Sequence, residues 1–189
     1  MGLDRVERLK QEYNVEVEWK AFDLRPGTPP EGIPRTDKLG EKRIGLPVDG
    51  HLGEMAREAG LTMNRAPIVP FTRPALEADE YAKSQGKFDE FHLAAFKAYW
   101  EAGKNLGDLA VLQQIAMDAG LDPAGLAQAI LEHRYTDVVE EQVEFARQVG
   151  ITGIPAFIMD RYLFMGAQPY DFFKMVADRV LQERVEAQG

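Results

Sequence analysis

The stretch GITGIPAFIM, residues 150–159, decides how the chain is expected to fold. Glycines at 150 and 153 indicate a turn, and the Ile154–Pro155 bond leads straight into an apolar run. Proline cannot donate a hydrogen bond to a sheet, so at the mouth of a buried strand it is confined to an edge, a first position or a special turn. A cis bond at 154–155 and a trans proline that begins an edge strand both fit this pattern.

The residues after Pro155 predict a β-hairpin followed by a helix. AFIM at 156–159, the pair Asp160-Arg161 and YLFM at 162–165 are typical of a strand, a tight turn and a second strand, with Gly166 closing the hairpin. Pro169 then opens a C-terminal helix. The apolar face of this helix consists of Phe172, Phe173, Val176, Val180 and Leu181.

The N-terminal part of the chain predicts a helix, a strand and a long loop. Apolar residues recur at helical spacing at Leu3, Val6, Leu9 and Tyr13. The segment VEVEWKAF, residues 15–22, alternates apolar with charged side chains, as a strand with one buried face does. Residues 25–50 are rich in proline, glycine and charge, which indicates a surface loop.

The middle of the chain is expected to be helical. One helix spans His51–Ala59, Pro74 opens another, and a last one covers Val138–Val149. Asp108 and Asp122 are placed as N-caps of two helices between them. Four aromatic residues at helical spacing are predicted to be core packing: Phe91, Phe96, Tyr99 and Trp100.

Composition excludes several classes of protein. With 22 basic and 31 acidic residues, the chain has a net charge of −9, which disfavours nucleic-acid binding. No apolar run reaches the length of a membrane span and the N-terminus lacks the apolar stretch of a signal peptide, so a soluble cytoplasmic protein is predicted.

The residue types that are missing limit the chemistry. The sequence has no cysteine, which removes disulfides, thiolate metal sites and cysteine nucleophiles from these 189 residues. Its one serine, Ser84, has no glycine elbow around it, which argues against a serine hydrolase. The three histidines, His51, His92 and His133, lack metal-ligand spacing, and no metal site is predicted.

Four segments together resemble the DsbA-like thioredoxin superfamily, in family order. They are VEVEWKAFDLRPGTPPEG, GKFDEFHLAAFKAYWEAGKNLGDLAVLQQIAMDAGLD, GITGIPAFIMD and FMGAQP. The chain is most similar to the FrnE-like branch, which borders the 2-hydroxychromene-2-carboxylate isomerases and the kappa-class glutathione transferases. The resemblance implies an α/β, thioredoxin-like fold of DsbA type. It divides the chain into an N-terminal thioredoxin-like part at 1–50, a helical insertion domain at 51–149 and a C-terminal thioredoxin-like part at 150–189.

The resemblance also implies a substrate-binding loop. Pro155 would be the cis-proline that faces an active-site dithiol, and the backbone of Ile154, after Gly153, would pair with an extended peptide or with glutathione. The resemblance would also place Gln168 at a glutathione contact of the isomerase branch. His92 is a further candidate that either faces the cleft or packs in the core.

The chain departs from this family at its beginning. Relatives carry Cys-x-x-Cys at the end of a first strand and the start of the first helix, and both the strand and the dithiol are missing here. That strand would lie between 15–22 and 156–159, so a gap in the sheet is expected. A strand from another copy, collapse of the flanking strands or recruitment of the 25–50 loop would fill it. We hypothesise that Met1 is an internal methionine of a longer protein.

Three functions therefore stay open. The first is a disulfide oxidoreductase or isomerase whose cysteines are absent from this chain, which would be inactive as given. The second is a glutathione-dependent isomerase or transferase, with glutathione as co-substrate and no other cofactor. The third is a cysteine-free scaffold that binds peptides. The expected partners are a disulfide-containing or extended peptide, or glutathione, with a homodimer as the expected assembly; no nucleic acid or membrane partner is expected.

Overall fold

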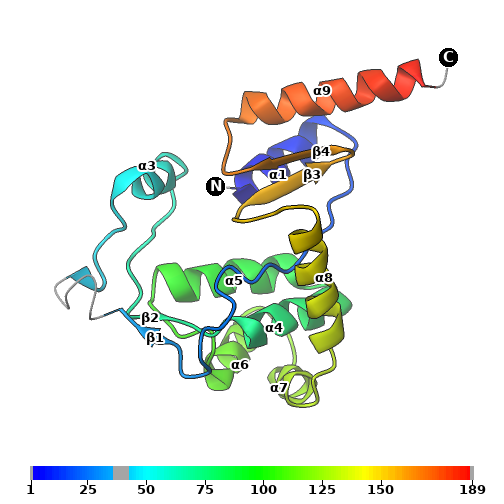
Figure 1. The fold of residues 1–189 in the computed structure, drawn as a ribbon. Helices are drawn as coiled ribbons and strands as arrows, with labels where there is room; N and C mark the ends of the chain where they lie inside the picture. Colours follow the sequence, from blue (N-terminus) through cyan, green and yellow to red (C-terminus); the bar gives the residue numbers. More distant parts are fainter. Residues whose placement is uncertain (1, 36–42, 188–189) are drawn as a thin grey trace. The chain divides into compact units, whose positions relative to one another are not determined.

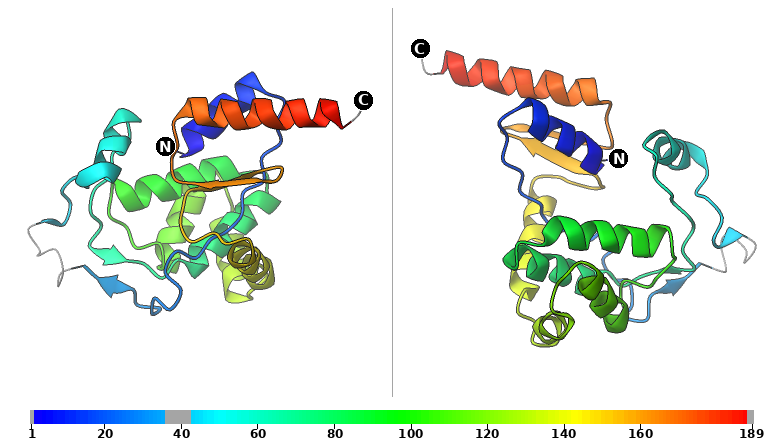
Figure 2. Two further views of the ribbon diagram at one scale, coloured as in Figure 1. Left: turned by 45° about the horizontal axis from the view of Figure 1, so that its top comes forward. Right: turned by 180° about the vertical axis from the view of Figure 1, so that it is seen from behind.

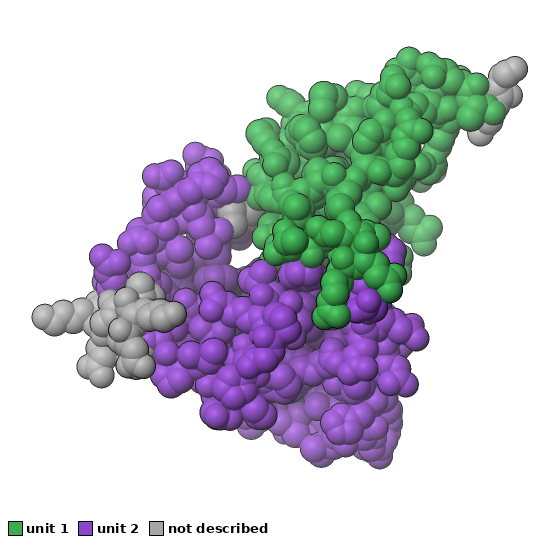
Figure 3. All heavy atoms as spheres, viewed as in Figure 1, with its two compact units in different colours: residues 1–19, 146–189 green, residues 20–145 purple. Residues whose placement is uncertain are grey.

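The structure is a computed structural model that describes residues 2–35 and 43–187. The chain divides into two compact units (Figure 3). One consists of residues 1–19 and 146–189, and is called unit 1 below; the other, unit 2, consists of residues 20–145. The units therefore change at 19/20 and 145/146, whereas the segments expected from the sequence change at 50/51 and 149/150.

Unit 1 is a β-hairpin with two helices packed on it. Its elements are α1 (Gly2–Glu12), β3 (Ala156–Met159), β4 (Tyr162–Met165) and α9 (Tyr170–Glu186). The strands are antiparallel and pair Ala156 with Met165 and Met159 with Tyr162, as expected for the predicted hairpin. The two helices lie side by side over this hairpin (Figure 1 and Figure 2).

Aromatic side chains hold the helices of unit 1 to one face of the hairpin. Phe157 and Phe164 form a cross-strand pair, and each meets the ring of Phe173 edge-on, with centroids 4.7 and 5.1 Å apart. Leu9 of α1 is buried in the same cluster. Strand residues alternate between faces, so Ile158 and Leu163 point away from this core.

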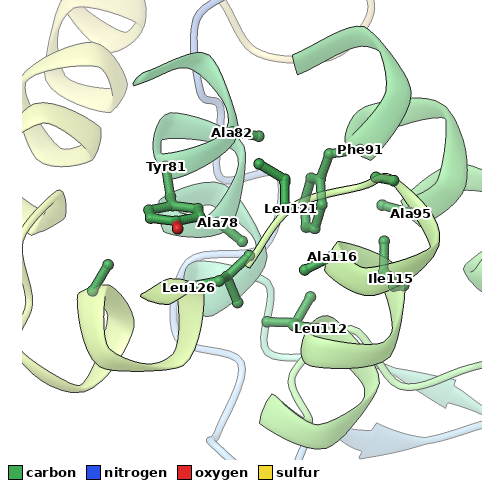
Figure 4. Packing of buried hydrophobic residues seen from close by; sticks show 12 residues of the cluster. Ala78, Tyr81, Ala82, Phe91, Ala95, Leu112, Ile115, Ala116, Leu121 and Leu126 are labelled. Atoms are coloured by element: carbon green, nitrogen blue, oxygen red, sulfur yellow. The ribbon is translucent and has the colours of Figure 1, made fainter. Parts of the chain in front are cut away.

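In its described residues, unit 2 consists of helices, the loops between them and one short strand pair. Its helices are α3 (Gly50–Glu58), α4 (Arg73–Ser84), α5 (Phe88–Trp100), α6 (Leu109–Asp118), α7 (Pro123–Leu131) and the greater part of α8 (Thr136–Gln148). The strands β1 (Ile33–Pro34) and β2 (Ile68–Val69) pair with each other. Figure 4 shows the core, in which Phe91, Leu112 and Leu126 have no exposed surface.

The two predicted caps in unit 2 are confirmed. The carboxylate of Asp108 accepts a hydrogen bond from the backbone N–H of Ala110. Asp122 accepts from Ala124 and Gly125 and is followed by proline at the first helical position. Both satisfy backbone donors that the helix itself cannot pair.

The predicted strand at residues 15–22 is wrong. Residues 14–22 belong to no helix or strand, although burial alternates from Asn14 to Ala21 as the sequence pattern requires. A strand needs a neighbour, and in the described residues the sheet of β3 contains β3 and β4 alone. The described part of the 25–50 loop does not fill the gap either, since its strand β1 pairs with β2; residues 36–42 lie outside the described residues.

Two further findings concern the surface. Phe96 was expected in the core, but half of it is exposed, because it packs beside the ring of His92 on the outer part of α5. Over the described residues, every helix is too short or too polar to cross a membrane.

Candidate functional site

The candidate site is the loop of unit 1 that leads into β3. The Ile154–Pro155 peptide bond is cis. The carbonyl of Pro155 accepts a hydrogen bond of 2.7 Å from the backbone N–H of Gly166, which continues the β3–β4 ladder by one pair. Gly153 has open space where a side chain would be, and Ile154 is 55% exposed. The loop therefore presents Ile154 to solvent beside an anchored proline.

The first turn of α1 packs on this proline. A β-carbon built on Gly2 would lie 3.4 Å from Cβ of Pro155 and 3.4 Å from Cζ of Phe157. The first N–H groups of a helix have no partners within the helix and carry a partial positive charge. The loop thus lies at the amino end of α1, as the resemblance implies, although residues 2 and 155 are far apart in sequence.

Gln168 forms hydrogen bonds that connect the end of the hairpin to α1. Its side-chain Nε2 donates to the carbonyl of Met165 at 2.9 Å, and its own backbone carbonyl accepts from Nε of Arg5 at 2.8 Å. Its backbone N–H donates to the carbonyl of Gly166, the residue bonded to Pro155. The predicted residues Gly153, Ile154, Pro155 and Gln168 are therefore brought together in unit 1, with the Gln168 amide engaged by the protein itself.

His92, the remaining predicted site residue, belongs to unit 2. Its Nδ1 lies 3.2 Å from a carboxylate oxygen of Asp79 on α4. Its ring stands between those of Phe88 and Phe96 on its own helix, with centroids 4.9 and 4.8 Å away. About a quarter of its side chain is exposed. These contacts link α4 to α5, which matches the packing role that the sequence also allowed.

Charged groups at the turn end of the hairpin connect it to α9. The hydroxyl of Tyr162 donates to Glu183 of α9 at 2.7 Å, and Arg161 and Arg179 each lie 2.6 Å from the same oxygen. The Tyr162 hydrogen bond and then the two arginines lower the pKa of Glu183. Because Tyr162 adjoins the turn and Pro155 lies at the opposite end of the strands, this cluster is structural rather than part of the loop site.

The described residues offer little other chemistry. No group of three or more histidine, aspartate or glutamate side chains among them is arranged to hold a metal ion. The whole sequence lacks cysteine. In the part of the chain that the structure describes, the backbone N–H and C=O of Ile154 have no hydrogen-bond partner, and groups of this kind can pair with an extended chain by strand addition.

The sequence pattern missed Gly2 and Arg5 as members of this site. A glycine and an arginine in the first turns of an amphipathic helix carry no local signal of a contact with residues 155 and 168. The family resemblance was the available signal, and it pointed to the loop residues Gly153, Ile154 and Pro155 and to Gln168.

Fold and loop together define a class of protein. The chain belongs to the family of the DSBA-like thioredoxin domain, whose model matches residues 1–176. A thioredoxin-like architecture with a loop of this kind at the amino end of a helix agrees with that assignment.

Individual relatives are consistent with it. The Bacillus subtilis protein YwbO, itself uncharacterized, is 30% identical over 169 residues, which cover 87% of this chain and 82% of that protein. The crystal structure of the probable DsbA oxidoreductase SCO1869 from Streptomyces coelicolor is similar in fold, with a TM-score of 0.78, 24% identity, and coverage of 96% of this chain and 84% of that one. A structure of 2-hydroxychromene-2-carboxylate isomerase has a TM-score of 0.67 at 14% identity, and covers 97% and 90% of the two chains.

Proposed function

We propose that this protein, a member of the DsbA-like family, takes part in thiol–disulfide exchange by binding the substrate polypeptide. In this proposal an extended, disulfide-containing segment pairs with the backbone of Ile154, next to Pro155 and the amino end of α1. The sulfur nucleophile has to come from outside these 189 residues, because the sequence contains no cysteine.

One observation carries the proposal. The loop before β3 exposes Ile154 while Pro155 is packed against Gly2 and anchored through its carbonyl to Gly166. A rigid, exposed backbone segment is suited to adding a strand, because its groups need no reordering when the partner arrives. Family membership supports disulfide-containing polypeptides as the substrate class.

Glutathione is the alternative ligand. It is worth testing because the fold is similar to that of 2-hydroxychromene-2-carboxylate isomerase. Glutathione would use the same Ile154 backbone and the amide of Gln168. That amide already donates to the Met165 carbonyl, so it would have to exchange one hydrogen bond for another and would gain little. The polypeptide proposal needs no such exchange.

A nuclear magnetic resonance titration of the ¹⁵N-labelled chain tests the proposal. A disulfide-containing peptide should shift the amide signals of Gly153 and Ile154, and glutathione at equal concentration should leave them in place. Shifts with glutathione alone would favour the isomerase-type function. In a parallel insulin-reduction assay, the chain alone should show no activity. Reduction at the rate of a dithiol enzyme would contradict the proposal that the sulfur nucleophile comes from outside these 189 residues.

Two variants at one position separate backbone pairing from side-chain contact. Ile154→Pro removes the N–H that is proposed to pair with substrate, and Ile154→Ala keeps that N–H and trims the side chain. Loss of one hydrogen bond of about 1.4 kcal/mol weakens binding about tenfold. Ile154→Pro should therefore show this loss in the peptide titration, whereas Ile154→Ala should change affinity less. Equal losses in both variants would contradict the backbone role.

A further inference from the structure

Met165, the last residue of β4, contacts the loop before β3 (residues 149–155) through its sulfur. Its Sδ accepts a hydrogen bond from the side-chain hydroxyl of Thr152 at 3.8 Å. Thr152 lies two residues before Ile154 in the loop. Met165 itself is held in place, because it pairs with Ala156 in the β3–β4 ladder. The sulfur therefore links the hairpin to the part of the loop that precedes Ile154.

Oxidation would change the chemistry of this contact. A thioether sulfur is a weak hydrogen-bond acceptor, whereas methionine sulfoxide is polar and carries an oxygen atom on the sulfur. An oxygen added on the side of Thr152 takes up the space in which the hydroxyl now lies. An oxygen added on the other side replaces the sulfur as the better acceptor. In both cases the present bond between Thr152 and Met165 is lost.

The Met165 side chain is accessible to a small oxidant. It is 40% exposed, because it lies on the face of the hairpin that points away from the aromatic core of unit 1. These 189 residues contain no cysteine, so methionine supplies the sulfur atoms that a peroxide oxidises. Oxidation of methionine by peroxide needs no cofactor and is a common modification of exposed thioethers.

Two other exposed methionines provide a comparison. Met117 of α6 is 56% exposed and Met175 of α9 is 58% exposed, so a peroxide reaches them at least as readily as Met165. In the part of the chain that the structure describes, neither of their sulfurs accepts a hydrogen bond, and neither residue belongs to the loop. Oxidation of these two therefore adds polarity to a helix surface and breaks no contact of the loop.

We propose that Met165 is a peroxide-sensitive modification site whose oxidation releases Thr152 and weakens substrate binding at Ile154. One oxygen of hydrogen peroxide bonds to the sulfur while the O–O bond breaks. The sulfur gives up two electrons and the peroxide is reduced. The second oxygen takes up the proton of the transferred hydroxyl and leaves as water. The product, methionine sulfoxide, is converted back by methionine sulfoxide reductases.

The effect on binding rests on the function proposed above, whereas the effect on the loop does not. A preorganised backbone binds more tightly, because it loses less conformational freedom when the partner arrives. Once Thr152 is released, the residues before Pro155 have to be ordered during binding. We expect binding of a disulfide-containing peptide to weaken about fivefold, which corresponds to ordering about one side chain.

The first test treats the full chain with hydrogen peroxide and compares its ¹⁵N–¹H spectra. Mass spectrometry measures the sulfoxide at each methionine. In the wild type and in Met175→Leu, oxidation should shift the amide signals of Thr152 and Ile154. Met165→Leu keeps an apolar side chain of similar size without sulfur, and its loop signals should stay in place. The proposal is overturned by a Met165 that stays reduced while Met175 is oxidised, by unchanged wild-type loop signals after oxidation of Met165, or by equal shifts in Met165→Leu.

Thr152→Val tests the contact itself. Valine has the shape of threonine without the hydroxyl, so Met165 is still oxidised in this variant but has no hydrogen bond to lose. Its loop signals should change less on oxidation than those of the wild type. Equal changes in both proteins would mean that the sulfoxide acts by another route, and the proposed role of Thr152 would be wrong.

The peptide titration separates this proposal from the proposed function. The oxidised wild type should bind the disulfide-containing peptide about fivefold more weakly, and treatment with methionine sulfoxide reductases for both epimers should restore the affinity. If the peptide binds neither form, the proposed function fails, while the peroxide-dependent signals of the free chain still decide whether Met165 controls the loop. Equal affinities of the oxidised and reduced forms would overturn the effect on substrate binding.

Discussion

The two compact units of this chain differ in how completely their cores are closed. Among the described residues, the main buried cluster of unit 2 has twelve members and includes residues with no exposed surface. The cluster of unit 1 has four buried members, and Phe157, Met159 and Phe164 around it are only partly covered. In unit 2 the helices α4 to α7 pack against one another around the cluster, whereas in unit 1 two helices cover one face of a hairpin.

The larger core and the loop proposed to bind substrate belong to different units. Unit 2 contains the larger buried cluster. Unit 1 carries the exposed loop at Ile154. Loops positioned by a rigid scaffold often carry binding residues, and the loop that we propose to bind substrate belongs to unit 1.

The largest expected effect on the free energy of unfolding comes from replacing a buried leucine by alanine in each of the two cores. Leu112 of unit 2 has no exposed surface and Leu9 of unit 1 is 6% exposed. Replacing Leu112 by alanine leaves an enclosed cavity and should cost about 4–5 kcal/mol, whereas Leu9→Ala should cost about 2–3 kcal/mol because the looser cluster can relax. Hydrogen exchange measured by mass spectrometry reports each unit separately. Equal costs would break the comparison, since both cores would then be equally closed.

Locally encoded features are the part of this fold that the sequence predicts well. The hairpin at 156–165 follows from two alternating runs around a tight pair, and the caps at Asp108 and Asp122 follow from a single side chain before a helix. Each of these depends on residues a few positions apart. Local propensity and hydrogen bonding are therefore enough to decide them.

Features that depend on distant partners could not be predicted from the local sequence pattern. Residues 15–22 have the pattern of a strand, and their side chains still alternate in burial, but pairing needs a neighbouring strand that the local pattern does not encode. The contact between Gly2 and Pro155 joins two residues that are far apart in the sequence. The exposure of Phe96 likewise depends on which helices cover that side of α5. Long-range packing decides all three.

A smaller effect is expected from the cap of α7 in unit 2. Asp122 accepts hydrogen bonds of 3.0 Å from two backbone N–H groups. Asp122→Ala leaves both without this partner and should cost about 1 kcal/mol, while Asp122→Asn keeps an acceptor and should cost a fraction of that. Thermal unfolding of the two variants measures the difference. If the asparagine variant lost as much stability as the alanine variant, charge rather than capping would be the cause.

The smallest expected effect is the acid sensitivity of unit 1. Hydrogen bonding from Tyr162, with Arg161 and Arg179 nearby, lowers the pKa of Glu183 in the folded protein. A carboxylate whose folded pKa lies below its unfolded value of about 4.3 stabilises the fold at higher pH, and that contribution is lost as the pH falls through the folded pKa. The clasp between β4 and α9 should therefore weaken in acid, at pH below about 4.

Tyr162→Phe isolates this contribution because it removes the first cause of the shift and retains the ring. Melting temperatures of the variant and the wild type should differ most at neutral pH and converge in acid. Tyr135→Phe is the control, since its hydroxyl bonds to Ser84 in unit 2 and no carboxylate is involved. A constant difference between Tyr162→Phe and wild type at every pH would mean that the hydroxyl acts through packing. The hairpin would then be held to α9 by its aromatic contacts alone, and the charged cluster would contribute nothing to the stability of unit 1.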